Sequence, residues 1–236
     1  MSVAILQNFI VTKPERLEIL GETFPFFAQY FKDNNFYINY NTDINFNEVY
    51  SIYKNEIFPQ NLNFYNNLTR DWGKIVQSML LDISEDYILI VPEDFKVVTK
   101  DKFYFKNLFN EFIEYECDYM LMHRIEDVKN YGTNPQYLPL YNSKEYLHVV
   151  NSSKYPGSCL SSVALYKKDF LNEFLTIYNT SQKSSRFSLA LPNCYEWFSH
   201  GEGVLHSLVG NRKFAIPKKA VVQHYEPFGL KQRTVI

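Results

Sequence analysis

Strand-like and helix-like segments alternate along the first two-thirds of this chain, and that alternation limits the fold more than any other feature. The strand-like runs 3–11, 36–40 and 62–65 alternate with segments such as 15–31, whose apolar residues recur at helical spacing. The clearest buried strand is Tyr-Ile-Leu-Ile-Val at 87–91. Alternation of this kind favours a mostly parallel sheet with helices on both faces, and we expect that α/β fold.

The remaining elements follow from the same two periodicities. Further helices are expected at 46–53, from the N-cap Asp71 to about residue 83, and at 102–116, 168–178 and 203–208. Further strands are expected at 119–122, 161–166, 213–216 and 220–223. Pro25 should end or kink the first helix, because a proline inside a helix removes a hydrogen bond. For the irregular stretch 124–155 we expect a loop-rich insertion with one or two hairpin strands.

Composition and charge narrow the class of protein. Of the 236 residues, 46% are hydrophobic and 21% are charged, which is typical of a folded chain. A formal net charge of -2 provides no basic field, so we expect no nucleic-acid partner. No apolar run approaches the roughly 18 residues of a membrane-spanning helix, so we expect no transmembrane segment. Because there is no internal repeat or linker, residues 1–236 are expected to form a single domain.

The cysteines and the N-terminus indicate a compartment. Cys117, Cys159 and Cys194 form no close pair, whereas a structural zinc site requires closely spaced cysteines. Scattered cysteines are typical of reduced thiols. The N-terminus has no basic region followed by an apolar stretch and a small-residue cleavage site. We therefore expect a cytoplasmic protein.

The residues after the 87–91 strand are the first candidates for a functional site. In a doubly wound sheet, ligands bind at the carboxyl ends of the strands. Pro92, Glu93 and Asp94 follow this strand directly. Mg²⁺ and Mn²⁺ prefer carboxylate oxygens together with substrate phosphates. The two acids are therefore candidates for a metal site, and the alternative is a solvated turn.

Two later segments carry further candidate groups. Residues 195–203 interleave acids and an imidazole with aromatics and glycines, which suits an acceptor pocket. Glu202 could be a general base if burial raises its pKa, or it could cap a helix N-terminus. His224 follows an apolar strand and could reach the same crevice as a metal ligand, or it could be a structural histidine.

Together these stretches resemble the glycosyltransferases of GT-A fold, particularly the broad family-2-like group. That family has an acidic motif after its fourth strand, a glycine loop, an acidic start to a catalytic helix, and a C-terminal histidine. The corresponding stretches here are 87–94, 155–159, 201–208 and His224. The segment from Thr12 to Arg16 is similar to the nucleotide contacts of the family after its first strand. The resemblance spans nearly the whole chain through short motifs in the same order.

The resemblance implies a Rossmann-like, mostly parallel sheet flanked by helices, with a loop-rich insertion on the acceptor side. The 1–123 half would bind the nucleotide and the 124–236 half the acceptor. It implies transfer of a hexosyl or deoxyhexosyl group from a nucleoside-diphosphate sugar, with UDP-sugars favoured, to a glycan or another hydroxyl acceptor. An inverting reaction that depends on Mn²⁺ or Mg²⁺ is also implied, and a homo-oligomer is compatible with it.

The resemblance also assigns roles to individual residues. Asp94 and His224 would hold the metal, and Glu202 or Glu196 would be the catalytic base. Trp197 and His200 would contact the acceptor. The nucleotide-sugar contacts that it implies are Val11, Thr12, Arg16, Asn41, Trp72, Lys74, Glu93 and Gly157.

Two positions depart from the family pattern, and two other functions stay open. Pro92 replaces the first Asp of the acidic motif, and Gly203 stands where the family usually has its catalytic Asp. A non-catalytic glycan- or protein-binding module with a decayed site is one alternative. The other is a sugar nucleotidyltransferase, which would normally carry a glycine-rich phosphate loop after the first strand, although residues 12–20 contain no glycine.

Overall fold

The computed structural model describes residues 3–8, 14–40, 45–67, 72–99, 101–122, 142–151, 163–181 and 212–225. Its strands are β1 (Val3–Asn8), β2 (Phe36–Asn39), β3 (Leu62–Tyr65), β4 (Tyr87–Ile90), β5 (Phe95–Val97), β6 (Tyr119–Leu121), β7 (Asn142–Ser143), β8 (Leu147–Asn151), β9 (Ala164–Lys167), β10 (Lys213–Pro217) and β11 (Val222–His224). Its helices are α1 (Pro14–Phe31), α2 (Phe46–Lys54), α3 (Trp72–Met79), α4 (Lys102–Glu114) and α6 (Lys168–Ser181), with a short 3-10 helix, η1 (Pro59–Asn61).

One large sheet forms the centre of the described part of the chain. Its nine strands follow the order β3-β2-β1-β4-β9-β6-β10-β8-β7, and β5 and β11 form a separate two-stranded sheet. β3, β2, β1 and β4 are parallel to one another, and so are β6 and β10. β9 and β8 run antiparallel to both of their neighbours. The expected α/β fold with a mostly parallel central sheet is therefore confirmed.

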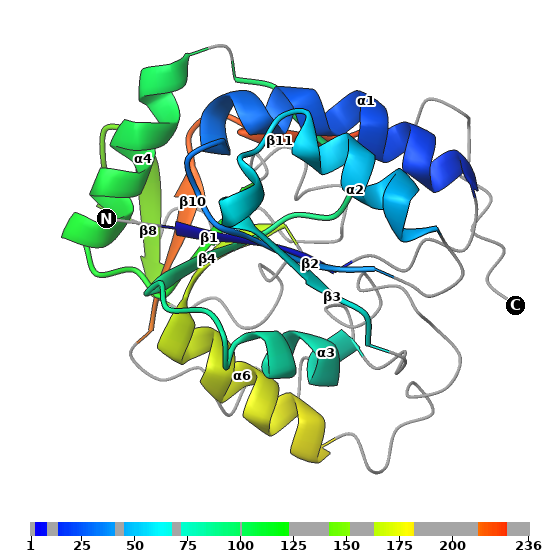
Figure 1. Ribbon diagram of the computed structural model, residues 1–236. Coiled ribbons are helices and arrows are strands. Elements are labelled where there is room, and N and C mark those ends of the chain that lie inside the picture. Colours follow the sequence, from blue (N-terminus) through cyan, green and yellow to red (C-terminus); the bar gives the residue numbers. More distant parts are fainter. Residues whose placement is uncertain are drawn as a thin grey trace, which may run out of the picture.

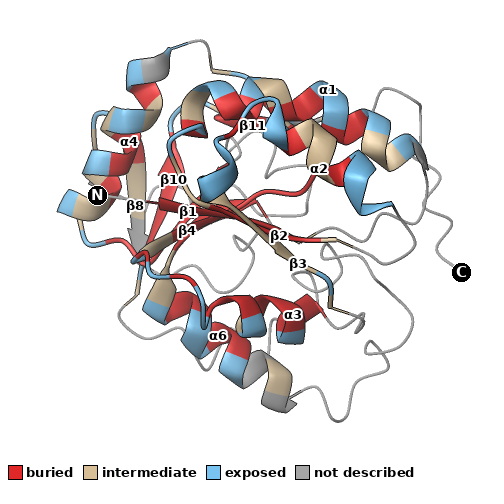
Figure 2. Cartoon of the chain, viewed as in Figure 1, coloured by how far each residue is buried: buried red, intermediate tan, exposed pale blue. Residues whose placement is uncertain are grey.

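Helices cover both faces of this sheet, with α1 and α2 on one face and α3 and α6 on the other (Figure 1). Neighbouring residues of β1 point to opposite faces, as the period of two requires. Ile5 packs into the core beneath α1 and α2, whereas Leu6 packs into the core against α3 and α6. Figure 2 shows the central strands as mostly buried and each helix as buried on one side only. The sheet thus separates two apolar layers.

Most of the expected elements lie where the sequence predicts them, and the exceptions have local causes. Pro25 lies inside α1 and does not end it, because the helix continues to Phe31 and buries Phe27 and Phe31. α3 ends at Met79, earlier than expected, although Ile83 is buried as predicted. The expected hairpin is confirmed by β7 and β8.

Some expectations lie outside the described residues: the Asp71 N-cap, the 203–208 helix and the end of the first strand beyond Asn8. Among the described helices, none has both the length and the apolar character to cross a membrane.

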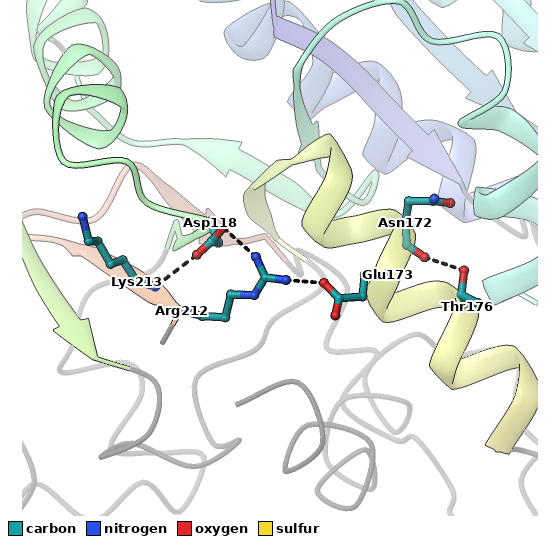
Figure 3. Close-up of polar contacts among 6 residues, drawn as sticks. All are labelled: Asp118, Asn172, Glu173, Thr176, Arg212 and Lys213. Carbon is teal, nitrogen blue, oxygen red and sulfur yellow. Dashed lines mark hydrogen bonds and ion pairs between the residues drawn. The ribbon is translucent and has the colours of Figure 1, made fainter. Parts of the chain in front are cut away.

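A polar cluster ties β6, β10 and α6 together at the amino end of β6 (Figure 3). The carboxylate of Asp118 accepts hydrogen bonds from the backbone N–H of Lys213 at 3.1 Å and from Arg212 at 3.4 Å. Arg212 also forms an ion pair with Glu173 of α6. These contacts lie before β6 begins, so they stabilise the edge of the sheet opposite to the carboxyl ends of its parallel strands.

Candidate functional site

The point where the strand order reverses lies between β1 and β4. The chain proceeds from β1 outward to β2 and β3, and then returns to place β4 on the other side of β1. Such a reversal opens a crevice at the carboxyl ends of the two central strands, where ligands bind in open α/β sheets. The pairing of β1 with β4 extends to Val91, whose N–H donates to the carbonyl of Leu6 at 3.2 Å. Pro92, Glu93 and Asp94 therefore follow immediately at this crevice.

Glu93 and Asp94 are buried acids that share one arginine. Their exposed fractions are 4% and 1%, so a solvated turn, the alternative at the sequence level, is wrong. Arg16, on the first turns of α1, forms an ion pair with Glu93 and approaches Asp94 Oδ2 at 3.3 Å. The backbone carbonyl of Glu93 accepts a hydrogen bond of 2.7 Å from the Thr23 hydroxyl. Helix α1 thus fixes both the backbone and the charge of the acidic segment.

The surroundings of the acidic pair raise the pKa of Glu93. The pKa of Glu93 is raised from 4.5 to about 7, by burial first and by the charge of Asp94 second, while Arg16 opposes the shift. Two adjacent carboxylates repel each other, and both contact Arg16. Repulsion of this kind favours a bound cation or a proton at the pair.

The small β5–β11 sheet brings the C-terminal histidine to the acids. His224 stands opposite Phe95 in the antiparallel register, and the N–H of Tyr225 donates to the carbonyl of Asp94 at 2.7 Å. The Tyr225 hydroxyl in turn donates to Glu22 of α1. The backbones of Asp94 and His224 are thus neighbours, and the metal-binding role of His224 stays a prediction, because its side chain is not described.

A chain of asparagine amides lies at the carboxyl ends of the three neighbouring parallel strands. Asn39 Nδ2 donates to Asn8 Oδ1 at 3.0 Å. Asn39 Oδ1 accepts from the backbone N–H of Asn67 at 3.1 Å and from its Nδ2 at 3.2 Å. On the other face of β1, Gln7 accepts a 2.7 Å hydrogen bond from the Tyr53 hydroxyl. The amides extend the polar floor of the crevice from β1 toward β3.

The other expected site residues are only partly described. Trp72 opens α3 and is buried, whereas Lys74, two residues further along, is exposed. Because α3 follows a parallel strand, its N-terminus lies on the carboxyl side of the sheet. Eight expected site residues lie outside the described residues: Val11, Thr12, Asn41, Gly157, Glu196, Trp197, His200 and Glu202.

The chemistry of the acids fits a hard divalent cation. Carboxylate oxygens are the protein ligands that Mg²⁺ and Mn²⁺ prefer, with phosphates and water filling the remaining positions. Within the described residues, no group of three or more His, Cys, Asp or Glu side chains could hold a metal ion. The donor set described here is therefore Asp94 with Glu93, already in contact with Arg16.

Sequence reasoning missed Asn8, Asn39 and Asn67 as members of the site. It named Asn41, two residues beyond the end of β2. The available signal was that Asn39 and Asn67 lie near the ends of the strand-like runs 36–40 and 62–65, whereas Asn8 lies inside the run 3–11. Only the register, in which Asn8 pairs with Asn39 and Asn39 with Tyr65, shows that these ends are level with one another.

The fold is similar to that of known structures, while no family model and no curated protein matches the chain. S. aureus TarS is 15% identical over 96% of this chain and 37% of that chain, with a TM-score of 0.57. Its 1–349 fragment is 16% identical over 96% and 61%, with a TM-score of 0.61. The same fragment in complex with UDP-GlcNAc is 15% identical over 97% and 60%, with a TM-score of 0.59. At these identities the likeness shows the fold alone, and the chain spans less than two-thirds of each of these structures.

Proposed function

We propose that this protein is a glycosyltransferase that takes its sugar from a nucleoside-diphosphate sugar. The observation that carries the proposal is the meeting of Arg16, Glu93, Asp94 and the His224 backbone at the β1–β4 crevice. A donor of this kind presents a diphosphate, which requires cationic groups, and a base, which requires polar groups at the strand ends. The similarity in fold to TarS, a fragment of which was solved with UDP-GlcNAc, makes UDP-sugars the first donors to test.

Each site residue has a role in this proposal. In the proposal, Arg16, which contacts both acids, would also contact the diphosphate, and the N-terminus of α3 at Trp72, with Lys74, would face it. Asp94, with Glu93 and His224, would hold Mn²⁺ or Mg²⁺, which would supply positive charge where the diphosphate departs. The acids are buried and tied to α1 and β11, so they need little rearrangement to receive a ligand.

The reaction itself exchanges one bond for another at the anomeric carbon. The acceptor hydroxyl oxygen forms a bond to that carbon, and the bond from the carbon to the diphosphate oxygen breaks. The hydroxyl proton passes to a carboxylate, for which we propose Glu202 or, second, Glu196. In the proposal Trp197 and His200 position the acceptor, which is a glycan or another hydroxyl compound, and the anomeric configuration is inverted.

Thermal shifts with nucleotides test the proposal. A ligand that binds only the native state raises the melting temperature by mass action. We expect UDP, among UDP, GDP, CDP and dTDP, to raise the melting temperature, and the shift to grow with Mn²⁺. If none of these nucleotides or their sugars produces a shift, the chain is better described as a glycan- or protein-binding module. Release of pyrophosphate from UTP and a sugar phosphate would instead identify a nucleotidyltransferase.

A pair of acidic substitutions tests the metal assignment. Asp94→Ala should remove the Mn²⁺-dependent part of the UDP shift, because the buried carboxylate is lost from the donor set. Asp86→Ala is the matched control, since Asp86 is an exposed acid just before β4 and away from the crevice. Equal Mn²⁺ dependence in the two variants would contradict the metal assignment. In addition, Glu202→Gln should keep UDP binding and lose sugar transfer.

A further inference from the structure

The amide chain at the strand ends has a fixed polarity. A backbone N–H can only donate, so the side-chain atom of Asn39 that meets the N–H of Asn67 is its oxygen. The other end of the Asn39 amide is therefore Nδ2, which donates to Asn8 at 3.0 Å. The atom of Asn8 that accepts is Oδ1, and the remaining atom of its amide is Nδ2. One unambiguous backbone donor thus orients all the amides that follow it.

This polarity leaves Asn8 Nδ2 as a buried donor at the crevice. Among the described residues, Asn8 Nδ2 has no hydrogen-bond partner. Buried donors without an acceptor cost free energy and are uncommon, and those that exist require an explanation. Asn8 is the last residue of β1, and because Leu6 pairs with Ile90, Asn8 is level with Pro92. The donor therefore lies beside the amide chain at the carboxyl end of β1, on the strand next to the start of the acidic segment.

We propose that Asn8 contacts the base of the donor nucleotide and discriminates against adenine, by donating from Nδ2 to a ring carbonyl oxygen of the base. This inference rests on the proposed function and adds a specificity-determining residue to it. Uracil, the base of UDP-sugars, carries two ring carbonyls, whose lone pairs accept a donor over a broad range of angles. Adenine has no ring carbonyl. Its Watson–Crick edge carries the acceptor N1 beside an amino group, and that amino group stands at the exocyclic position where uracil has a carbonyl oxygen, so a donor placed for that oxygen would meet another donor. The amide chain thus favours uridine over adenosine nucleotides.

The substitution Asn8→Asp preserves the size and shape of the side chain and adds one negative charge. An aspartate keeps the oxygen that accepts from Asn39 and replaces Nδ2 with an acceptor. We expect the dissociation constant of UDP to rise about 10- to 100-fold, because the variant loses the donor and places a carboxylate oxygen against the carbonyl oxygen of the base, so that two acceptors face each other. The dissociation constant of inorganic pyrophosphate, measured with Mn²⁺, should change less than about twofold, which separates loss of base recognition from simple charge repulsion.

Asn34→Asp is the matched control. Its Nδ2 donates to the carbonyl of Val3 at 2.8 Å, at the amino end of β1, so the variant makes the same chemical change at the opposite edge of the sheet. UDP binding should be unchanged in this variant. If Asn8→Asp does not fold, the ¹H–¹⁵N signals of the Asn8 side chain in the wild-type protein provide the second measurement. One amide proton should move downfield with UDP and stay in place with pyrophosphate.

The outcomes separate this inference from the proposed function. Three results would each overturn the inference without contradicting the proposed transferase function. The wild-type protein could bind UDP and ADP equally, the Asn8→Asp variant could bind UDP as the wild type does, or UDP could leave the Asn8 amide signal unmoved. A wild-type protein that binds no nucleotide at all would overturn both. Preference for UDP over ADP that is lost in Asn8→Asp and kept in Asn34→Asp would establish the assignment.

Discussion

At neutral pH the Glu93 carboxyl lowers the free energy of unfolding, and the charge of its neighbour Asp94 contributes to this effect. Its buried carboxyl has a pKa raised from 4.5 to about 7, with burial as the first cause and the Asp94 charge as the second. Between these two pH values the folded protein holds a proton that the unfolded chain has released. The free energy of unfolding therefore falls as pH rises through this window, and it is unaffected by Glu93 below it.

Substitution of Glu93 by Gln should remove this pH dependence. The wild-type protein should lose on the order of 3 kcal/mol of its unfolding free energy between pH 4.5 and 7 through this one group, and the Glu93→Gln variant should not. Urea unfolding of both proteins across this range measures the effect. The unfolding free energy of the variant relative to that of the wild type should increase with pH. A difference that stays constant with pH would mean that Glu93 is not the group that titrates.

Asp118 and Glu173 both contact Arg212 (Figure 3), yet they should contribute differently to the free energy of unfolding. Asp118 is 8% exposed and also accepts from the Lys213 N–H, so Asp118→Ala leaves that donor without its acceptor and should cost about 1–3 kcal/mol. The Glu173 side chain is 46% exposed, so Glu173→Ala should cost less than about 1 kcal/mol. Chemical denaturation of the two variants measures both changes in unfolding free energy. Equal decreases would mean that the hydrogen bond from the Lys213 N–H to Asp118 does not contribute to stability.

At the scale of elements, helix α1 contains a glycine that packing does not require. Gly21 is exposed, and a Cβ added there meets nothing within 4 Å. Gly21→Ala should therefore raise the free energy of unfolding by about 0.5–1 kcal/mol, by reducing the freedom of the unfolded chain. Calorimetry should show a higher melting temperature. Gln29→Ala, at another exposed position of α1, is the control and should change it little.

The sequence predicts elements well where one physical factor dominates, and poorly where two compete. The run at 87–91 is apolar throughout, so β4 was predictable from its residues. Pro25 was expected to end or kink α1, but the burial of Phe27 and Phe31 beyond it outweighs the lost hydrogen bond. β5 has three residues and exists because β11 pairs with it, and local patterning cannot reveal such a partner.

At the scale of the whole molecule, Cys117 should report global unfolding. The residue is 1% exposed, and burial raises the pKa of its thiol to about 12. In a Cys159→Ser, Cys194→Ser background, we expect a thiol reagent at pH 8 to modify the native protein at least about a thousandfold more slowly than the urea-unfolded chain. The modification rate should rise with urea in parallel with unfolding. Rapid modification of native protein would indicate local opening near β6.

The charged residues of the candidate site could be predicted from the sequence, but the contacts that bring them together could be predicted only in part. Glu93, Asp94 and His224 stand out in the sequence because acids and a histidine follow apolar strands. Arg16 was named as a nucleotide contact, whereas its ion pairs with the two acids follow from the packing of α1 against β5. The asparagine chain depends on the register of three strands, which no short motif encodes.

The β5–β11 ladder also has a consequence for the order in which the protein matures on the ribosome. It joins residues 95–97 to residues 222–224, so the acids meet the His224 segment only after residues 98–221 have been synthesised. Domains fold from the N-terminus during synthesis, and the first four parallel strands can pair before β11 exists. A nascent chain can therefore form the β1–β4 crevice while it still lacks the strand that pairs with β5 beside the acids. Under the proposed function, activity would begin only once residues 222–224 have been added.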